Sequence, residues 1–438
     1  MPLRFTFAFI VSMFCLFING QISYEILKPC PEKISNTAVA GITISNRPYV
    51  YVFSGIDSTK NYQGIHARSY KYDLIDDEWT VLADLPGGQD RIAAGASTIK
   101  DKIYILGGYE VFEDGNEVSL NQLHIFNPIS DTFLEDGAPI PTPIDDQVQV
   151  VYKDSLLYSV TGWSNIGNVN EVWMYNPVED IWSACTPLPL GPIFSSFGSS
   201  GSIVGDTLYF LGGASEIGPF NLSDRFRKGY INPEDPTEIE WIVEKTNDAV
   251  GYRMGAIQVA GLALWLGGSQ VSYNYDGIAY NGSGGVPALS RVLQYDPSSG
   301  KFFETVGLIP EIMDLRGLAK VGSFSFVSVG GMIADQEVTD MVVKYKLDVT
   351  PQSYDYQEDD SFYFKSNPVA NLLEIYNESQ GVKQALELYN SSGLLVKRIN
   401  RPTFPLRIDC SDWVDGIYYV RILDNRGFAE TKSVAVIH

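Results

Sequence analysis

Histidine, cysteine and positive charge are all scarce in this chain of 438 residues. The histidines are too far apart in sequence to suggest a metal site, and we predict none: His66, His124 and His438. Four cysteines without a CxxC pair argue against a disulfide framework, so we expect isolated buried thiols at Cys30, Cys185 and Cys410. The sequence also lacks a Rossmann fingerprint, a phosphate-binding loop and a GxSxG elbow. We therefore expect neither a cofactor nor a set of catalytic residues.

Basic residues number 31 against 53 acidic residues, which gives a net charge of -22. Such a protein repels a polyanion, so the composition argues against a nucleic-acid partner. The excess acidic residues are either ordinary solvent-exposed side chains or part of a surface that binds cations, and this charge is compatible with both.

Long hydrophobic runs are missing except at the N-terminus. There, Arg4 precedes an apolar stretch over residues 5–18, which is short for a membrane span but suits the hydrophobic region of a secretory signal peptide. The sequence predicts a signal peptide over residues 1–20, cleaved after Gly20. We expect an exported mature chain with no transmembrane segment.

What the chain does contain is a repeated pattern of an aliphatic run ending in glycine. The pattern recurs roughly every 50 residues, in the runs that end at Gly55, Gly108, Gly162, Gly213, Gly268 and Gly331. After each run come an alternating strand pattern and an aromatic residue, and in four copies a second aromatic follows seven residues later, at Trp79, Phe133, Trp182 and Phe302. Period-2 strands joined by tight turns predict one four-stranded sheet per repeat. Six such sheets indicate a radial array, because a single small sheet cannot bury both of its faces.

The sixth repeat lacks its last strand, since Gln352 stands where the second aromatic is expected. At the other end of the chain, Tyr24 precedes Pro31 by the interval that separates Trp79 from Pro86. The sequence therefore predicts that residues 22–28 supply the outer strand of the sixth sheet, so that the ring is closed by the N-terminal strand.

These glycine doublets, spaced aromatics and six-fold recurrence resemble the kelch repeat family, and the resemblance covers residues 22–348. It implies an all-β fold: a six-bladed kelch β-propeller over residues 21–348, closed by an N-terminal strand. The family has no single function, so the resemblance does not name one.

Composition changes after the last repeat. Residues 349–361 are acidic and polar and are expected to form a linker, and short strand patterns over residues 362–438 predict a small β-sandwich. The sandwich sequence resembles the C-terminal sorting domain of the type IX secretion system, in the segments Ser366–Asn371, Leu388–Asn390 and Gly416–Val420. The resemblance implies that the secretion machinery binds residues 362–438, and that the protein is released or attached to the outer cell surface of a Gram-negative bacterium. A generic carbohydrate-binding or adhesive sandwich is the alternative.

Candidate binding residues lie in the loops that lead into the inner strands, which share one face of a propeller with the loops after the glycines. Arg91, Arg253 and Arg316 recur there, and Asp146 occupies a comparable position. Converging guanidinium groups would bind a carboxylate or an acidic glycan, as arginines at this place do in other kelch propellers. Alternatively, each arginine bonds carbonyls and acids of the neighbouring blade.

Other candidates belong to variable loops. Tyr273 and Tyr275 lie in the long loop 269–290, which is either an adaptable recognition loop or simply a long surface loop. His66 is placed in a loop on the same face, where it is either a ligand contact or an ordinary surface histidine.

Rich loops and sparse catalytic chemistry predict a secreted or surface-displayed binding protein whose ligand is a glycan or a protein. The alternative is a sugar isomerase that resembles the kelch-type sialic acid mutarotases. In that case one of the three arginines would hold the sugar carboxylate, while Glu216 or Asp146 moved a proton. We expect binding rather than catalysis.

Overall fold

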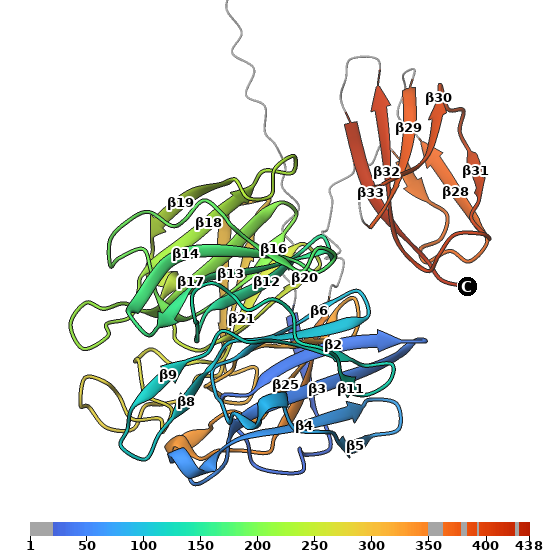
Figure 1. Cartoon of the computed structure of the whole chain (residues 1–438). Coiled ribbons are helices and arrows are strands. Elements are labelled where there is room, and N and C mark those ends of the chain that lie inside the picture. The colour runs from blue at the N-terminus through green and yellow to red at the C-terminus, as the bar shows by residue number, and fades with distance from the viewer. Residues whose placement is uncertain (1–20, 349–361, 378–382, 392–393, 425–428) are drawn as a thin grey trace, which may run out of the picture. The chain divides into compact units, whose positions relative to one another are not determined.

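The computed structural model describes residues 21–348, 362–377, 383–391, 394–424 and 429–438 (Figure 1). The predicted signal peptide, residues 1–20, and the predicted linker, residues 349–361, lie outside the described residues. The chain divides into two compact units, with the division between residues 350 and 351. Each unit is described by itself.

The first unit contains six four-stranded antiparallel sheets, one for each sequence repeat. Sheet one consists of β2 (Ala38–Ile44), β3 (Arg47–Ile56), β4 (Ile65–Asp73) and β5 (Glu78–Val81). Sheet two consists of β6 (Gly95–Ile99), β7 (Lys102–Leu106), β10 (Leu123–Asn127) and β11 (Thr132–Phe133). Sheet three consists of β12 (Val148–Tyr152), β13 (Leu156–Ser164), β14 (Gly167–Asn176) and β15 (Ile181–Ala184). Sheet four consists of β16 (Phe197–Val204), β17 (Thr207–Ala214), β18 (Arg225–Ile231) and β19 (Ile239–Lys245). Sheet five consists of β20 (Gly255–Val259), β21 (Leu262–Leu266), β22 (Arg291–Asp296) and β23 (Lys301–Val306). Sheet six consists of β24 (Ala319–Lys320), β25 (Ser325–Val329), β26 (Val342–Asp348) and the N-terminal strand β1 (Gln21–Ile26).

Smaller elements decorate the loops between these strands. A two-stranded hairpin, β8 (Tyr109–Val111) with β9 (Glu117–Ser119), follows the glycine doublet of sheet two. Four short 3-10 turns cover Tyr62–Gly64, Pro86–Gly88, Asn247–Ala249 and Ala334–Gln336. No helix in the described ranges has the length and apolar character that a membrane crossing requires.

The N-terminal strand completes the sixth sheet. β1 pairs antiparallel with β26, with Tyr24 opposite Tyr345 and Ile22 opposite Leu347. The strand spans residues 21–26 rather than the expected 22–28. Beyond it, Leu27 and Cys30 still donate N–H groups to the Val342 and Asp340 carbonyls, but outside a regular strand. Ile22 points into the core and is 5% exposed, whereas Tyr24 is 49% exposed.

Six hydrophobic clusters hold neighbouring sheets together. One cluster lies between each pair of successive sheets, and the cluster of Ile34, Val50 and Val52 with Val327 and Val342 joins the first sheet to the sixth. In Figure 1 the late strand β25 accordingly lies beside the early strands β2 and β3. The sheets thus form a ring in which each sheet buries both faces against its neighbours.

The seven-residue aromatic interval is a cross-strand contact. In four sheets the two aromatics lie directly opposite each other on the outer strands: Tyr72 with Trp79, Phe126 with Phe133, Tyr175 with Trp182, and Tyr295 with Phe302. Their ring centroids are 4.8–5.1 Å apart, which is ordinary packing for aromatic pairs. Sheet four differs, because Trp241 lies opposite Gly229 instead of Tyr230.

Each glycine doublet fits tightly against the next sheet. The second glycine donates its N–H to a carbonyl in the loop of the following sheet, as Gly213 does to Gly251 at 2.8 Å and Gly268 to Ile312 at 2.8 Å. The first glycine has a positive φ, and a Cβ built on Gly212 would lie 2.1 Å from the Gly251 oxygen. Any side chain at this position would push the two sheets apart, which explains the repeated glycines.

The second unit is a two-sheet β structure. One sheet holds β27 (Phe362–Phe364), β28 (Leu372–Asn377) and β31 (Leu406–Asp409), and the other holds β30 (Leu395–Asn400), β29 (Lys383–Asn390), β32 (Gly416–Asp424) and β33 (Ala429–Val436). Leu373, Ile375, Leu388, Val420 and Val434 form a core between the two sheets. The sequence patterns predicted strands over residues 362–364, 371–376, 385–390, 394–399, 416–422 and 433–437. They missed β31, whose LRID run alternates apolar and polar residues but is only four residues long.

The three cysteines of the described residues are buried free thiols, as expected. Burial raises the pKa of the Cys30 and Cys185 thiols to about 12, so both thiols are protonated at neutral pH.

Candidate functional site

One residue with a left-handed backbone lies just before the inner strand, or within its first two residues, in every sheet of the ring. These residues are Asn36, Ala93, Asp146, Gly198, Arg253 and Asp314, with φ between 46° and 66°. Backbone bonds connect the middle four in series: Asp146 donates its N–H to the Ala93 oxygen, Gly198 to Asp146, and Arg253 to Gly198, at 2.9–3.2 Å. The left-handed turn therefore places one residue per sheet around the centre of the ring, and in sheet four that residue is a glycine without a side chain.

Four charged side chains meet at this centre. Arg253 makes two bonds to the Asp146 carboxylate, Nε to Oδ1 at 3.2 Å and Nη2 to Oδ2 at 2.7 Å, and its Nη1 lies 3.0 Å from Asp314 Oδ1. Arg316 approaches the same Asp146 from the other side, with Nη1 3.0 Å from Oδ1. Two guanidinium groups and two carboxylates thus balance each other's charge in a buried position.

The surroundings favour the charged forms of Asp146 and Arg253 but oppose that of Asp314. Burial alone would raise the pKa of Asp146, but Arg253 and Arg316 outweigh it and lower that pKa below its ordinary value. Burial opposes the charge of Arg253, and the neighbouring carboxylates raise its pKa nonetheless. Burial raises the pKa of Asp314, which Arg253 and the Ser35 hydroxyl, 2.6 Å from Oδ2, oppose.

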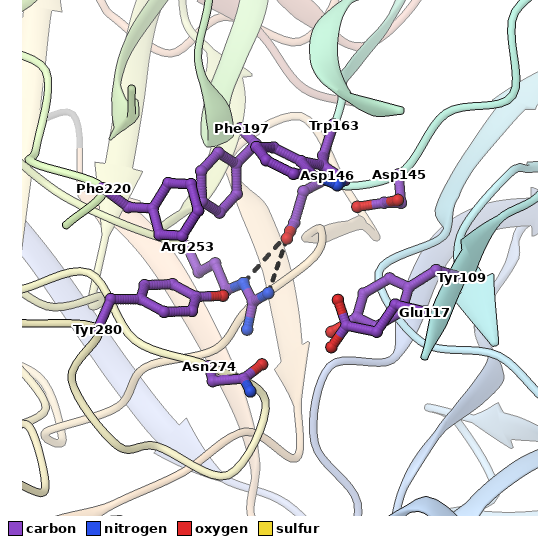
Figure 2. A pocket seen from close by; sticks show the side chains of 10 residues that line it. All are labelled: Tyr109, Glu117, Asp145, Asp146, Trp163, Phe197, Phe220, Arg253, Asn274 and Tyr280. Carbon is purple, nitrogen blue, oxygen red and sulfur yellow. Dashed lines mark hydrogen bonds and ion pairs between the residues drawn. The ribbon is translucent and has the colours of Figure 1, made fainter. Parts of the chain in front are cut away.

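Above Arg253 a cavity of about 100 Å³ opens among loops of sheets two to five (Figure 2). Its lining consists of Tyr109, Glu117, Asp145, Asp146, Trp163, Phe197, Phe220, Arg253, Asn274 and Tyr280. Phe197 is the first residue of the inner strand β16. The other residues come from loops that lead into the inner strands, or from segments that follow the glycines. We call this cavity the channel-face pocket.

Aromatic rings form one wall of the channel-face pocket. Trp163, Phe197 and Phe220 contact one another edge to face, with centroids 5.3–5.5 Å apart, and Tyr280 lies 4.9 Å from Phe220. Tyr109 closes the opposite side, next to Glu117 (Figure 2). The wall is drawn from three sheets, so it exists only when the ring is assembled.

Two further carboxyl groups lie in the pocket outside the balanced group of four. Asp145 is 3% exposed and accepts a hydrogen bond of 2.6 Å from Ser119 Oγ, while Glu117 reaches in from the exposed rim on the β8–β9 hairpin. Burial, reinforced by Asp146, raises the pKa of Asp145 well above its ordinary range, and burial also raises the pKa of Glu117. Within the described part of the chain, neither carboxylate has an ion-pair partner.

The structure brings together two of the three predicted arginines. Arg253 and Arg316 meet at Asp146, but Arg91 does not join them. Arg91 stands two residues before the left-handed position of its sheet, and its fully buried guanidinium bonds the carbonyls of Gln89 and Gly107 at 3.5 and 3.2 Å. Burial lowers the pKa of Arg91 to about 10. Gln89 and Gly107 belong to loops of the same sheet as Arg91, whereas the alternative predicted carbonyls and acids of the neighbouring blade.

His66 is neither in a loop nor on the surface, so both of its expected placements were wrong. It lies in β4, is 5% exposed, and has Nε2 3.5 Å from Glu32 Oε1. Burial lowers its pKa to about 4, which leaves the ring neutral at pH 7.

The two predicted tyrosines of the long loop take separate positions. Tyr273 is fully buried beneath Arg253, whose guanidinium carbon lies 5.5 Å from the ring centroid. Tyr275 packs instead with Tyr109 and Val111 near sheets one and two. Neither tyrosine lines the channel-face pocket, but Asn274 between them does, as does Tyr280 of the same loop.

Sequence reasoning missed Tyr109, Glu117, Trp163, Phe197 and Asn274 as parts of the pocket. The available signal was positional, because all but Phe197 follow a glycine of the repeat within the next few residues or within the same loop. The β8–β9 hairpin that carries Glu117 has the turn signal Asp114-Gly115, but it lies outside the six-fold repeat pattern and was not predicted.

Comparisons with known proteins agree with this architecture. A family described as the secretion system C-terminal sorting domain matches residues 366–436. Kelch-like protein terF of Aspergillus terreus is 26% identical over 197 residues, which cover 43% of this chain and 40% of that protein. Kelch-like protein 25 of Xenopus tropicalis is 26% identical over 43% of this chain and 30% of its own length. The propeller is similar to kelch-like proteins, and residues 366–436 match the secretion sorting domain.

The solved structure of YjhT superposes on this kelch-type chain with a TM-score of 0.57 and 17% identity, covering 72% of this chain and 96% of that one. At this identity the match speaks for the fold alone. The chain spans less than half the length of the curated relatives it matches, so their whole-protein activities do not transfer. The expected all-β fold and the resemblance to kelch and sorting families are confirmed. The sorting domain indicates a secreted or cell-surface protein.

Proposed function

We propose that this kelch-type protein is an exported binding protein that recognises a glycan or a protein at the channel-face pocket. The observation that carries the proposal is the pocket itself, which combines an aromatic wall with carboxyl and amide groups at the one place where loops of four sheets converge. Aromatic faces and a few fixed polar groups are the usual composition of a ligand site. The propeller acts as a rigid frame and the variable loops provide specificity.

Export is the second part of the proposal. Residues 1–20 act as a signal peptide cleaved after Gly20, the sorting domain over residues 362–438 is bound by the type IX machinery at the outer membrane, and residues 349–361 link it to the propeller over residues 21–348. The sorting-family match to residues 366–436 supports this order of events. Deleting residues 362–438 is expected to leave the propeller inside the cells of the native host. The same deletion chain found in the medium or on the outer surface would overturn the export route.

Binding is tested with the full exported chain on glycan and protein arrays. Trp163→Ala and Tyr280→Ala remove parts of the aromatic wall and are expected to abolish capture, whereas Tyr230→Ala changes an exposed tyrosine on β18 that does not line the pocket. Capture that is equal in all four proteins would place recognition elsewhere.

A sugar isomerase is the second candidate, because a carboxyl group with a raised pKa in a cleft is the feature expected of a proton-transfer residue. Arg253 argues against the isomerase, because its Nε, Nη1 and Nη2 already bond Asp146 and Asp314 and are not free to bind a sugar carboxylate. Anomer exchange of sialic acid, followed by NMR, decides between the two candidates. A rate above that of buffer, lost in Asp145→Asn, would support the isomerase.

A further inference from the structure

Two carboxyl groups of the channel-face pocket have no ion-pair partner in the described residues. Arg253 and Arg316 are matched one for one by Asp146 and Asp314, so these four groups contribute no net charge. Glu117 and Asp145 remain, and in the described residues no cation pairs with either of them. A buried carboxylate without a counter-ion is costly, so Asp145 holds a proton in the free protein and becomes a carboxylate when a cation lies beside it.

Aromatic rings surround the place where that partner would sit. Trp163, Phe197, Phe220 and Tyr280 pack edge to face on one side, while Asp145 and Glu117 lie on the other (Figure 2). The faces of aromatic rings attract cations, and desolvated sites of this kind recognise ammonium groups. Anions are disfavoured, because Arg253, the only arginine lining the pocket among the residues described, is buried and already bonded to carboxylates through Nε, Nη1 and Nη2.

We infer that the channel-face pocket binds its ligand through an ammonium group, held between the aromatic wall and the carboxylates of Asp145 and Glu117. The inference rests on the proposed binding function and replaces the acidic ligand expected from the arginines. Two sources supply this chemistry: an amino sugar within a glycan, or the side chain of a lysine in a protein. The small cavity admits such a group while the rest of the ligand stays on the propeller face.

Matched pairs of small probes test the charge requirement in the full exported chain. By saturation-transfer NMR and calorimetry, n-butylammonium is compared with n-butanol, and glucosamine with N-acetylglucosamine. The charged member of each pair is expected to bind at least about tenfold more tightly. Preference for glucosamine over n-butylammonium would identify an amino sugar as the source, and the reverse preference a lysine side chain. Equal binding of charged and neutral members, or tighter binding of acetate, would overturn the inference.

Variants locate the site. Asp145→Asn keeps the shape and the Ser119 bond but removes the charge, and it is expected to weaken n-butylammonium binding about tenfold or more. Glu117→Gln at the exposed rim serves as a second variant that leaves the buried groups intact, with a smaller loss of affinity. The control is Glu113→Gln in the exposed turn of the same hairpin, outside the pocket. Unchanged affinity in both pocket variants would disprove the inference.

Failure of this inference is distinguishable from failure of the proposed function. If arrays capture a ligand in a manner that needs Trp163 but the ammonium probes do not bind, the pocket is a binding site for a neutral group. If neither the arrays nor the probes bind, both proposals fall together.

Discussion

Asp146 and Arg253 face each other across the centre of the propeller, 107 residues apart in sequence, and are joined by two hydrogen bonds. Both residues have left-handed backbones, and the chain holds each of them through bonds to the loop of a neighbouring sheet. The pair therefore links sheet three to sheet five directly, and Asp314 and Arg316 extend the link to sheet six.

The first prediction concerns the stability of this central pair. Asp146→Asn leaves two buried guanidinium groups facing an uncharged amide, and we expect the free energy of unfolding to fall by about 3–5 kcal/mol. Urea unfolding followed by tryptophan fluorescence measures the loss. As a control, Glu337→Gln breaks the exposed pair with Lys33 and is expected to leave the midpoint unchanged. Equal midpoints for all three proteins would mean that the central charges do not hold the ring together.

A second prediction separates crowding from backbone conformation at two glycines. Gly212 and Gly205 have nearly the same φ, 68° and 63°, but a Cβ on Gly212 meets the Gly251 oxygen at 2.1 Å while a Cβ on Gly205 meets no atom within 4 Å. Gly205→Ala is expected to cost about 1 kcal/mol from its backbone conformation alone. Gly212→Ala is expected to cost at least about 3 kcal/mol more, because two sheets must separate. Thermal melting of both variants checks the difference, and similar melting temperatures would contradict the steric explanation.

A third prediction tests the closing strand. Ile22 is buried against sheet five, so Ile22→Ala is expected to lower the stability of the propeller by about 2–4 kcal/mol. Tyr24→Ala, two residues along the same strand, changes a half-exposed side chain and is expected to cost less than about 1 kcal/mol. If Ile22→Ala costs no more than Tyr24→Ala, the strand adds little to the stability of the ring.

Much of the fold was predictable because its rules are local. Each glycine doublet, each seven-residue aromatic pair and each turn is set by a few neighbouring residues, so the repeat could be read without knowing how the sheets assemble. Even the distant pairing of Tyr24 with Tyr345 followed from counting which strand the last repeat lacked. The missed strand β31 obeys no such repeat.

The site was less predictable, because a shift to two residues before the left-handed position keeps an arginine from reaching the centre of the ring. Arg91 and Arg253 look equivalent in their sequence contexts, yet the left-handed residue of sheet two is Ala93, and Arg91 turns toward Gly107. Charge compensation was equally hidden, since Asp314 and Asp146 reach Arg253 from other sheets. The arginines suggested an acidic ligand, whereas their pairing leaves Asp145 and Glu117 as the uncompensated groups.

The last prediction is the pH dependence of ligand affinity at Asp145. The groups that act on Asp145 are Asp146 beside it, Glu117 and Ser119 on β9, and Arg316, and burial with the nearby acids raises its pKa. A bound cation favours the charged carboxylate, so a proton must leave when the cation binds. Affinity should therefore be weak below the raised pKa, increase by up to about tenfold per pH unit as the pH rises toward it, and become constant above it.

Tetramethylammonium suits this measurement, because its charge does not change with pH. Calorimetric titrations between about pH 5 and 9 are expected to give the rising curve for the unmodified chain and a weak response to pH for Asp145→Asn, in which only Glu117 still titrates in the pocket. A flat curve for the unmodified chain would show that Asp145 keeps its protonation state when the cation binds, and the carboxylate would then have no part in holding the ammonium group.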